Sequence, residues 1–152
     1  MEAFFFDILR NMPLWTAIAG WFIAQLIKFF VDIVKNKRIS LYVLLLSTGG
    51  MPSSHSSFVT SLMVAVGFRE GFHSAMFAVS AIVAMVTMAD AAGIRRAAGK
   101  QAAVLNMLIE HLNNPHISLD KKLRELLGHS PVEVAAGACL GTFIAIAANQ
   151  LI

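Results

Sequence analysis

The chain has 152 residues, of which 57% are hydrophobic and 14% are charged, and its mean hydropathy is +0.70. Soluble domains carry about 25% charged residues, so this composition excludes an ordinary soluble protein and predicts one membrane-embedded domain, residues 1–152. The formal charge of +3 favours attraction to lipid phosphate or a topology signal. Because no basic stripe is interleaved with aromatic residues, we expect no binding to nucleic acid.

Four segments are expected to cross the bilayer as helices, because lipid leaves exposed strand edges without hydrogen-bond partners. They run from about Leu14 to Val34, from near Pro52 to near Phe68, from about Phe72 to Ala89, and from Pro131 to Ile152. About 20 helical residues span a hydrocarbon core of about 30 Å, and the second segment is short, with a polar first turn. The sequence therefore predicts an all-α membrane bundle with about four spans.

The segment between the third and fourth spans has a different character. Apolar residues recur there at helical spacing, at Ala98, Ala102, Leu105, Leu108, Ile109 and Leu112. The pattern predicts an amphipathic helix that lies at the membrane interface or packs on the bundle. A short helix is expected from Ser118 to Gly128, and the apolar piece from Ile39 to Ser47 is too short to span.

The positive charges gather at one membrane face if the four spans alternate in direction. Ten of the twelve cations fall there: Lys28, Lys35, Lys37, Arg38, Arg95, Arg96, Lys100, Lys121, Lys122 and Arg124. Arg10 and Arg69 fall opposite. The positive-inside rule therefore predicts a multi-pass protein of the cell membrane with the charged face in the cytoplasm, although cations that bind phosphate would give the same asymmetry.

The second span opens with Gly-Gly-Met-Pro-Ser-Ser-His-Ser-Ser, residues 49–57. Free N–H groups at a helix start attract anions, and serine hydroxyls add donors. A polar helix cap with an interfacial histidine would be the ordinary interpretation. Four serines and His55 at membrane depth favour a functional site instead, because lipid penalises unsatisfied polar groups.

The fourth span opens with two competing patterns that share one carboxylate. Ser130 and Glu133 fit a capping box, with Pro131 at the first helical position. Glu133 also lies one turn past His129, where it could accept a hydrogen bond from the imidazole and fix its tautomer. The sequence does not choose between them, and both are expected to hold only if the carboxylate divides its two oxygens.

The third span ends with Asp90 and the arginine pair Arg95 and Arg96, followed by Lys100. Paired arginines commonly anchor a helix at the interface, but they also supply planar, always-charged donors suited to a phosphoryl group. Asp90 is expected to pair with one of them or with Lys28. Lys28 lies inside the first span, where snorkelling to the interface is its ordinary explanation.

These motifs resemble those of a known superfamily. Pro52-Ser53-Ser54-His55 is similar to the P-S-G-H motif of the type 2 phosphatidic acid phosphatases and vanadium haloperoxidases, and residues 129–137 resemble their H-x-x-x-D motif. From Lys28 through Gly141 the chain looks like the divergent branch of small membrane proteins. Its distinctive strings are Gly-Gly-Met-Pro-Ser-Ser-His and Asp-Ala-Ala-Gly-Ile-Arg-Arg-Ala-Ala-Gly-Lys-Gln-Ala.

The resemblance implies a role for each matching residue. His129 would be the nucleophile that forms a phosphohistidine, Glu133 would orient it, and His55 would protonate the leaving oxygen. The expected phosphate ligands are Arg95, Arg96, Lys28, Ser53, Ser54 and Lys100. The mechanism needs no cofactor, and no ligand spacing predicts a metal site, although Asp90 leaves a magnesium requirement open.

The chain departs from the superfamily pattern at four places. Ser54 replaces a glycine, and Glu133 replaces an aspartate, which moves the carboxylate outward by a methylene. The expected Lys-x6-Arg-Pro is absent, which leaves Lys28 as the best candidate. Arg124 lies five residues before His129 instead of six and follows a leucine. The arginine pair is therefore preferred to Arg124 as the counterpart of the superfamily arginine. In that interpretation the amphipathic segment is an insertion that separates this arginine from His129.

The favoured function is hydrolysis of a phosphomonoester on a membrane lipid of the phosphatidic acid or phosphatidylglycerol phosphate class. The alternatives are a polyprenyl diphosphate phosphatase, a non-catalytic binder of phospholipid or anions, a small transporter, and a haloperoxidase that holds vanadate. The transporter is disfavoured because the polar groups cluster at one face. Gly137 and Gly141 suit close helix packing within the bundle or across a homodimer.

The predicted orientation can be tested at Lys100. We expect Lys100→Cys, in a Cys139→Ser background, to escape a membrane-impermeant maleimide added to intact cells and to react after permeabilisation, because the charge bias places it in the cytoplasm. Labelling of that cysteine from outside intact cells would reverse the orientation.

Overall fold

The protein is an all-α membrane bundle in its computed structural model, which describes residues 2–36, 50–111 and 128–151. Six helices are described: α1 (Glu2–Leu9), α2 (Met12–Asn36), α4 (Ser54–Glu70), α5 (Ala75–Ala92), α6 (Ile94–His111) and α7 (Pro131–Gln150). The predicted fold class is confirmed. Of the expected pieces, the segment from Ile39 to Ser47 and nearly all of the short helix from Ser118 lie outside the described residues.

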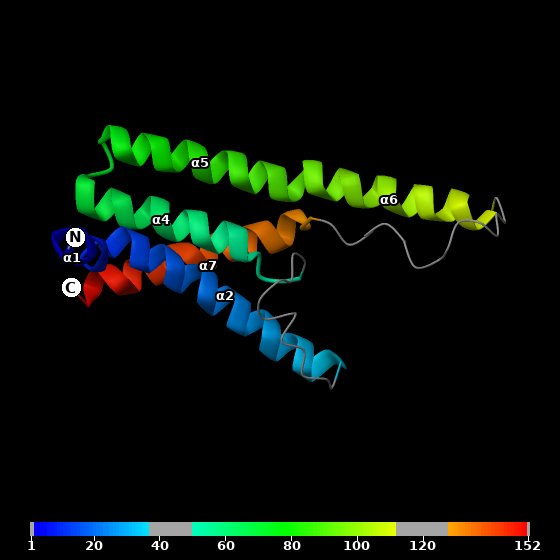
Figure 1. Ribbon diagram of the computed structural model, residues 1–152, viewed down its shortest axis with the longest axis horizontal. Helices are drawn as coiled ribbons and strands as arrows, with labels where there is room; N and C mark the ends of the chain where they lie inside the picture. Colours follow the sequence, from blue (N-terminus) through cyan, green and yellow to red (C-terminus); the bar gives the residue numbers. More distant parts are fainter. Residues whose placement is uncertain (1, 37–49, 112–127, 152) are drawn as a thin grey trace.

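Helix α4 lies at the centre of the bundle and packs against α2, α5 and α7 (Figure 1). Three helical stretches are long and apolar enough to cross a membrane: Met12–Val34, Ala75–Ile109 and Pro131–Gln150. The expected span from Pro52 to Phe68 corresponds to α4. Its 17 residues rise about 25 Å, and its composition is more polar because its neighbours are helices rather than lipid.

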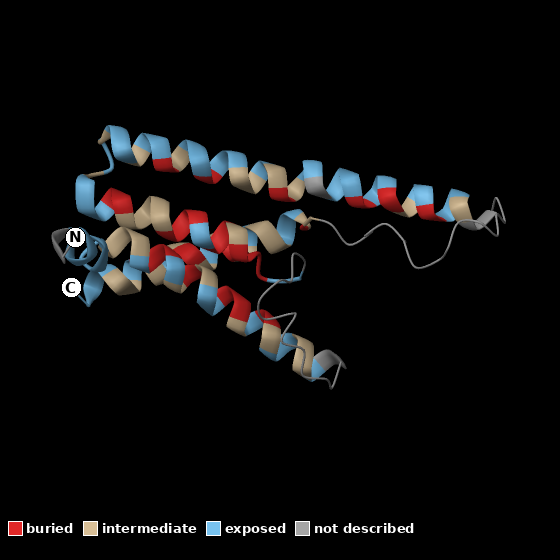
Figure 2. Cartoon of the chain, viewed as in Figure 1, coloured by how far each residue is buried: buried red, intermediate tan, exposed pale blue. Residues whose placement is uncertain are grey.

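Burial in the described residues is inverted relative to a water-soluble protein. The buried polar side chains include Thr16, Gln25, Lys28 and Ser57. Large apolar side chains are exposed instead, and Figure 2 shows the exposed outer surface of α5, which carries Met76, Val79, Ile82 and Val86. A hydrocarbon solvent accounts for this arrangement, since apolar groups then face lipid and polar groups must find partners inside the protein.

Small residues and hydroxyl groups bring α2 and α7 close to α4. Ser57 Oγ donates to the carbonyl oxygen of Gly20 at 2.8 Å, and Ser61 Oγ donates to that of Gly141 at 3.0 Å. A Cβ atom at Gly141 would collide with Ser57 and Thr60. The small-residue pair Gly137 and Gly141 therefore serves packing within the chain, and a homodimer would need another surface.

The amphipathic segment continues the third span instead of folding back on the bundle. Helices α5 and α6 follow nearly one line (Figure 1), and of the described helices only α5 makes substantial contact with α6. Gly93 lies between them, and its N–H donates to the carbonyl oxygen of Ala89 at 2.8 Å. Helix α6 thus begins four residues earlier than the apolar pattern from Ala98 indicated.

One described helix was not expected from the sequence. Helix α1 precedes the first span and lies at the same end of the bundle as the C-terminal end of α7 (Figure 1). Phe4, Phe5 and Phe6 are exposed on it. Aromatic side chains of this kind concentrate at membrane–water interfaces, so α1 marks the membrane boundary at the end away from Ser54.

The packing of α7 on α4 predicts the effect of a larger side chain at Gly141. We expect Gly141→Leu to lower the free energy of unfolding by about 1–3 kcal/mol, since it must separate the two backbones. The matched control is Ala135→Leu, an exposed position on the same helix. Thermal unfolding in detergent measures both variants, and equal melting temperatures would contradict the close packing.

Candidate active site

The start of α7 is joined by one backbone hydrogen bond to the start of α4 and by another to the end of α5. The N–H of Ser53 donates to the carbonyl oxygen of Glu133 at 2.9 Å, and the N–H of His129 donates to that of Ala91, in the last turn of α5, at 2.9 Å. Two helix N-termini therefore converge beside the end of a third helix. Such N-termini favour anions, because free N–H groups and the helix dipole both point at the ligand.

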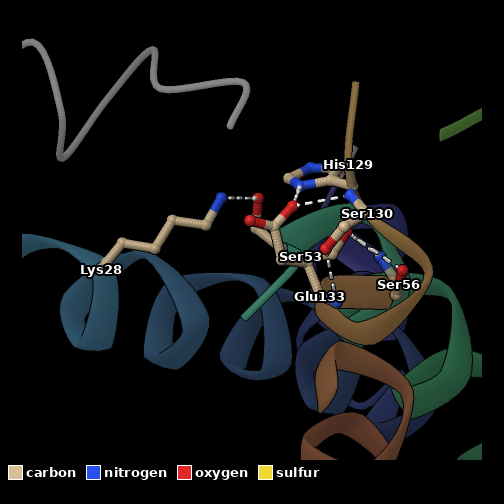
Figure 3. Close-up of polar contacts among 7 residues, drawn as sticks. Lys28, Ser53, Ser56, His129, Ser130 and Glu133 are labelled. Carbon is tan, nitrogen blue, oxygen red and sulfur yellow. Dashed lines mark hydrogen bonds and ion pairs between the residues drawn. The ribbon is translucent and has the colours of Figure 1, made fainter. Parts of the chain in front are cut away.

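His129 is buried between these helix starts, with an exposed fraction of 2%. Its Nδ1 lies 3.3 Å from Glu133 Oε2, and the same Oε2 accepts the N–H of Ser130 at 2.8 Å (Figure 3). The capping box is complete, since Ser130 Oγ accepts the N–H of Glu133 at 3.3 Å. The capping box and the contact between carboxylate and imidazole therefore occur together, while the orienting role of Glu133 stays a prediction.

The carboxylate of Glu133 does not divide its oxygens as expected. One oxygen serves the cap and the imidazole together, because a carboxylate oxygen has lone pairs for two donors. A carboxylate at this place favours the tautomer of His129 that carries its proton on Nδ1 and its lone pair on Nε2. In that tautomer Nε2 is the ring nitrogen that can act as a nucleophile.

His55 lies in the first turn of α4 and is partly buried. Its ring centroid is 6.1 Å from that of His129, and the two ring planes are inclined by 59°. The topology thus brings together two histidines that are 74 positions apart in the sequence. Two imidazoles at this separation can stand on either side of one small tetrahedral anion.

Lys28 reaches the same place from the middle of α2 (Figure 3). Its exposed fraction is 4%, its Nζ donates to Ser54 Oγ at 3.2 Å, and its charge interacts with that of Glu133. The side chain of Lys28 therefore points into the protein. The expected snorkelling to the membrane interface is wrong. Lys28 supplies a positive charge beside both helix starts.

The serines in residues 49–57 stabilise the start of α4 through hydrogen bonds. Ser53 is the N-cap of α4, and its Oγ accepts hydrogen bonds from the N–H of Ser56 at 3.3 Å and from Ser56 Oγ at 3.0 Å. Ser54 holds the ammonium of Lys28. These bonds fix the position of His55 by fixing the helix turn that carries it.

Two of the other expected phosphate ligands, Arg96 and Lys100, form no hydrogen bond or ion pair with this cluster or with any other described residue. Both lie exposed on α6. The side chain of Arg95, and Arg124 altogether, lie outside the described part. Asp90 lies in the last turn of α5, next to Ala91. The roles of these residues stay predictions.

The described residues hold no group of three or more histidine, cysteine, aspartate or glutamate side chains that could bind a metal ion. They do contain a buried residue that the sequence analysis overlooked. Gln25, three residues before Lys28, has an exposed fraction of 3%, and its Oε1 has no hydrogen-bond partner among the described residues. The sequence could have drawn attention to Gln25, because an amide three positions from a lysine is unusual within an apolar span.

Comparisons with known proteins identify the family of the chain. A family model described as "Divergent PAP2 family" matches residues 9–144. The chain is similar to an "Uncharacterized membrane protein YuiD" of Bacillus subtilis (strain 168), with 40% identity over 151 residues that cover 92% of this chain and 95% of that protein. No solved structure matches the chain significantly. Phosphatases of the PAP2 family generally need no cofactor.

Because Glu133 contacts both the Ser130 N–H and the His129 ring, substitutions should affect the helix cap and the imidazole separately. We expect Glu133→Gln to keep the melting temperature near that of the parent, because the amide oxygen still accepts the N–H of Ser130. Glu133→Ala should cost about 1 kcal/mol through loss of the cap. In the glutamine variant the ¹⁵N shifts of the His129 ring should change, because the charge that holds the Nδ1 proton is gone.

The control for this experiment is Ser130→Ala, which weakens the cap but leaves the carboxylate beside the imidazole. Its His129 ring shifts should match those of the parent protein. Unchanged ring shifts in Glu133→Gln would show that the carboxylate does not set the tautomer.

Proposed function

Because the chain belongs to the divergent PAP2 family, we propose that it is a membrane lipid phosphatase. The proposed substrate is a phosphomonoester of the phosphatidic acid or phosphatidylglycerol phosphate class. The observation that carries the proposal is the pairing of His129 with Glu133 at 3.3 Å beside a second imidazole 6.1 Å away. Nucleophile, orienting carboxylate and proton donor are the parts that covalent phosphoryl transfer requires.

The first chemical step forms a phosphohistidine. His129 Nε2 attacks phosphorus, the bond from phosphorus to the lipid oxygen breaks, and His55 gives its proton to that oxygen, so the lipid leaves as an alcohol. Glu133 stabilises the positive charge that develops on the His129 ring. Nucleophile and proton donor must flank the phosphoryl group, and the separation of the two rings supports that arrangement.

The second step releases inorganic phosphate. Neutral His55 takes a proton from a water molecule, the water oxygen attacks phosphorus, and the bond from phosphorus to His129 Nε2 breaks. Both histidines then return to their starting protonation states. No redox change or further reactant is needed.

Charge stabilisation of the phosphoryl group comes from several sources in this proposal. Lys28 and the N–H groups at the starts of α4 and α7 are directly available. Ser53 and Ser54 hold that environment in place. Arg95, Arg96 and Lys100 remain proposed ligands, and they would add positive charge if α6 bends toward the bundle at Gly93.

The membrane location supports a lipid as the substrate. The phosphate of a lipid lies at the membrane surface, where α4 and α7 begin, while its acyl chains can lie against the exposed apolar surfaces of the helices. A cytoplasmic site favours phosphatidic acid or phosphatidylglycerol phosphate, which are made on that face. An outward-facing site favours a polyprenyl diphosphate. The cysteine labelling at position 100 determines the orientation of the site, so its result also distinguishes these two substrate classes.

Substitution of the two histidines tests the proposal. With phosphatidic acid in mixed micelles, we expect His129→Ala to abolish phosphate release and His55→Ala to lower it by about 100-fold or more. With p-nitrophenyl phosphate, whose leaving group needs little protonation, His55→Ala should retain much more activity for the first step and accumulate phosphohistidine. The matched control is His73→Ala, because His73 is an exposed histidine in the turn between α4 and α5, at the other end of the bundle.

Two results would contradict the phosphatase. The first is full phosphate release by a folded His129→Ala variant, which would place the activity elsewhere. The second is saturable binding of phosphatidic acid without turnover by the parent protein across a panel of lipid phosphates, with and without magnesium. That second result would identify a non-catalytic binder of phospholipids.

A further inference from the structure

A cavity lies at the end of the bundle opposite the histidines. It has a volume of about 460 Å³ and is lined by residues of α2, α4 and α7. The lining includes Thr16, Ala65, Phe68, Arg69, Ala145 and Asn149. Arg69 follows His55 by 14 positions on α4, which corresponds to about 21 Å along the helix. The cavity and the candidate active site therefore face opposite leaflets.

The polar side chains of this cavity have no partner in the described part of the chain. Arg69, Asn149 and Thr16 form no hydrogen bond or ion pair there; Thr16 is buried, whereas Arg69 and Asn149 are exposed. A guanidinium, an amide and a hydroxyl thus converge on a cavity whose other walls are apolar. Cavities of roughly 300–1,000 Å³ with few polar groups on apolar walls are typical of ligand sites.

The surroundings place the mouth of the cavity at the level of lipid headgroups. Trp15 lies in the first turn of α2, between the lining residues Pro13 and Thr16, and its Nε1 donates to the carbonyl oxygen of Ile8 at 3.0 Å. Helix α1 adds exposed phenylalanines at the same end. Aromatic residues of this kind mark the interface between hydrocarbon and water.

We propose that this cavity binds an anionic phospholipid of the leaflet opposite the histidines. The phosphodiester would accept hydrogen bonds from Arg69 and Asn149, and the start of an acyl chain would lie against Ala65, Phe68 and Ala145. Arginine suits the phosphate group because its planar donors can bind two oxygens at once. The proposal does not depend on the histidine chemistry, since no residue is shared between the two sites.

The experiment uses the full chain in nanodiscs and reads the fluorescence of Trp15. A Trp21→Phe background leaves Trp15 as the only tryptophan. Two lipid mixtures are compared. In one, phosphatidylglycerol with acyl chains brominated near the headgroup is mixed with unbrominated phosphatidylcholine. In the other, the phosphatidylcholine carries the bromine and the phosphatidylglycerol does not. We expect phosphatidylglycerol to quench with about two- to fivefold higher apparent affinity, the range for one partly exposed ion pair.

Two substitutions should remove this preference by different routes. Arg69→Gln removes the charge. Ala148 also lines the cavity, and Ala148→Leu fills the space while keeping the arginine. Arg10→Gln is the matched control, because Arg10 lies at the same end but stacks on Phe6, with its Cζ 4.1 Å from the ring centroid. That variant should keep the preference, and so should His129→Ala, even if the proposed phosphatase activity proves absent.

Three outcomes would overturn the proposal. Equal quenching by the two brominated lipids in the parent protein would show that the cavity does not select an anionic lipid. An unchanged preference in both Arg69→Gln and Ala148→Leu would place the selection elsewhere. Relief of the phosphatidylglycerol preference by millimolar inorganic phosphate alone would identify a site for free anions instead of a lipid.

Discussion

The close approach of α2 and α7 to α4 is the contact on which the rest of the structure depends. In a lipid solvent the hydrophobic effect does not drive helices together, so packing and hydrogen bonds must do so. Gly20 and Gly141 provide the space, and Ser57 and Ser61 donate into the carbonyl groups of the neighbouring helices. Without this packing, Lys28, His55 and His129 would belong to separate helices with no common site.

The same packing explains why α4 tolerates so many hydroxyl groups. Ser57 and Ser61 donate to backbone carbonyls of α2 and α7. Ser56 donates to Ser53 Oγ and Thr60 donates to the carbonyl oxygen of Ser56, so these two hydroxyl groups are satisfied at the start of α4 itself. A transport pathway would need polar groups directed at an open channel. The hydroxyl groups in the centre of the bundle therefore serve its structure, while the two candidate sites lie at its ends.

Glu133 links the fold to the candidate chemistry. One of its oxygens completes the cap of α7 and also lies 3.3 Å from His129 Nδ1, so the residue that caps the helix also contacts the imidazole. Lys28 approaches from α2 and adds positive charge next to this carboxylate. The candidate active site is thus formed where α4 and α7 begin and where Lys28 of α2 reaches them.

The sequence alone determined what depends on local chemistry: apolar spans, the Ser130–Glu133 cap, the glycines that permit close packing, and the amphipathic character of α6. These follow from periodicity and from residues a few positions apart. Only the tertiary structure decided that Lys28 turns inward to Ser54, that one oxygen of Glu133 serves two donors, that α4 is the central helix, and that Arg69 borders a cavity with Thr16 and Asn149. Those features depend on which faces of distant helices meet, and no local pattern encodes that choice.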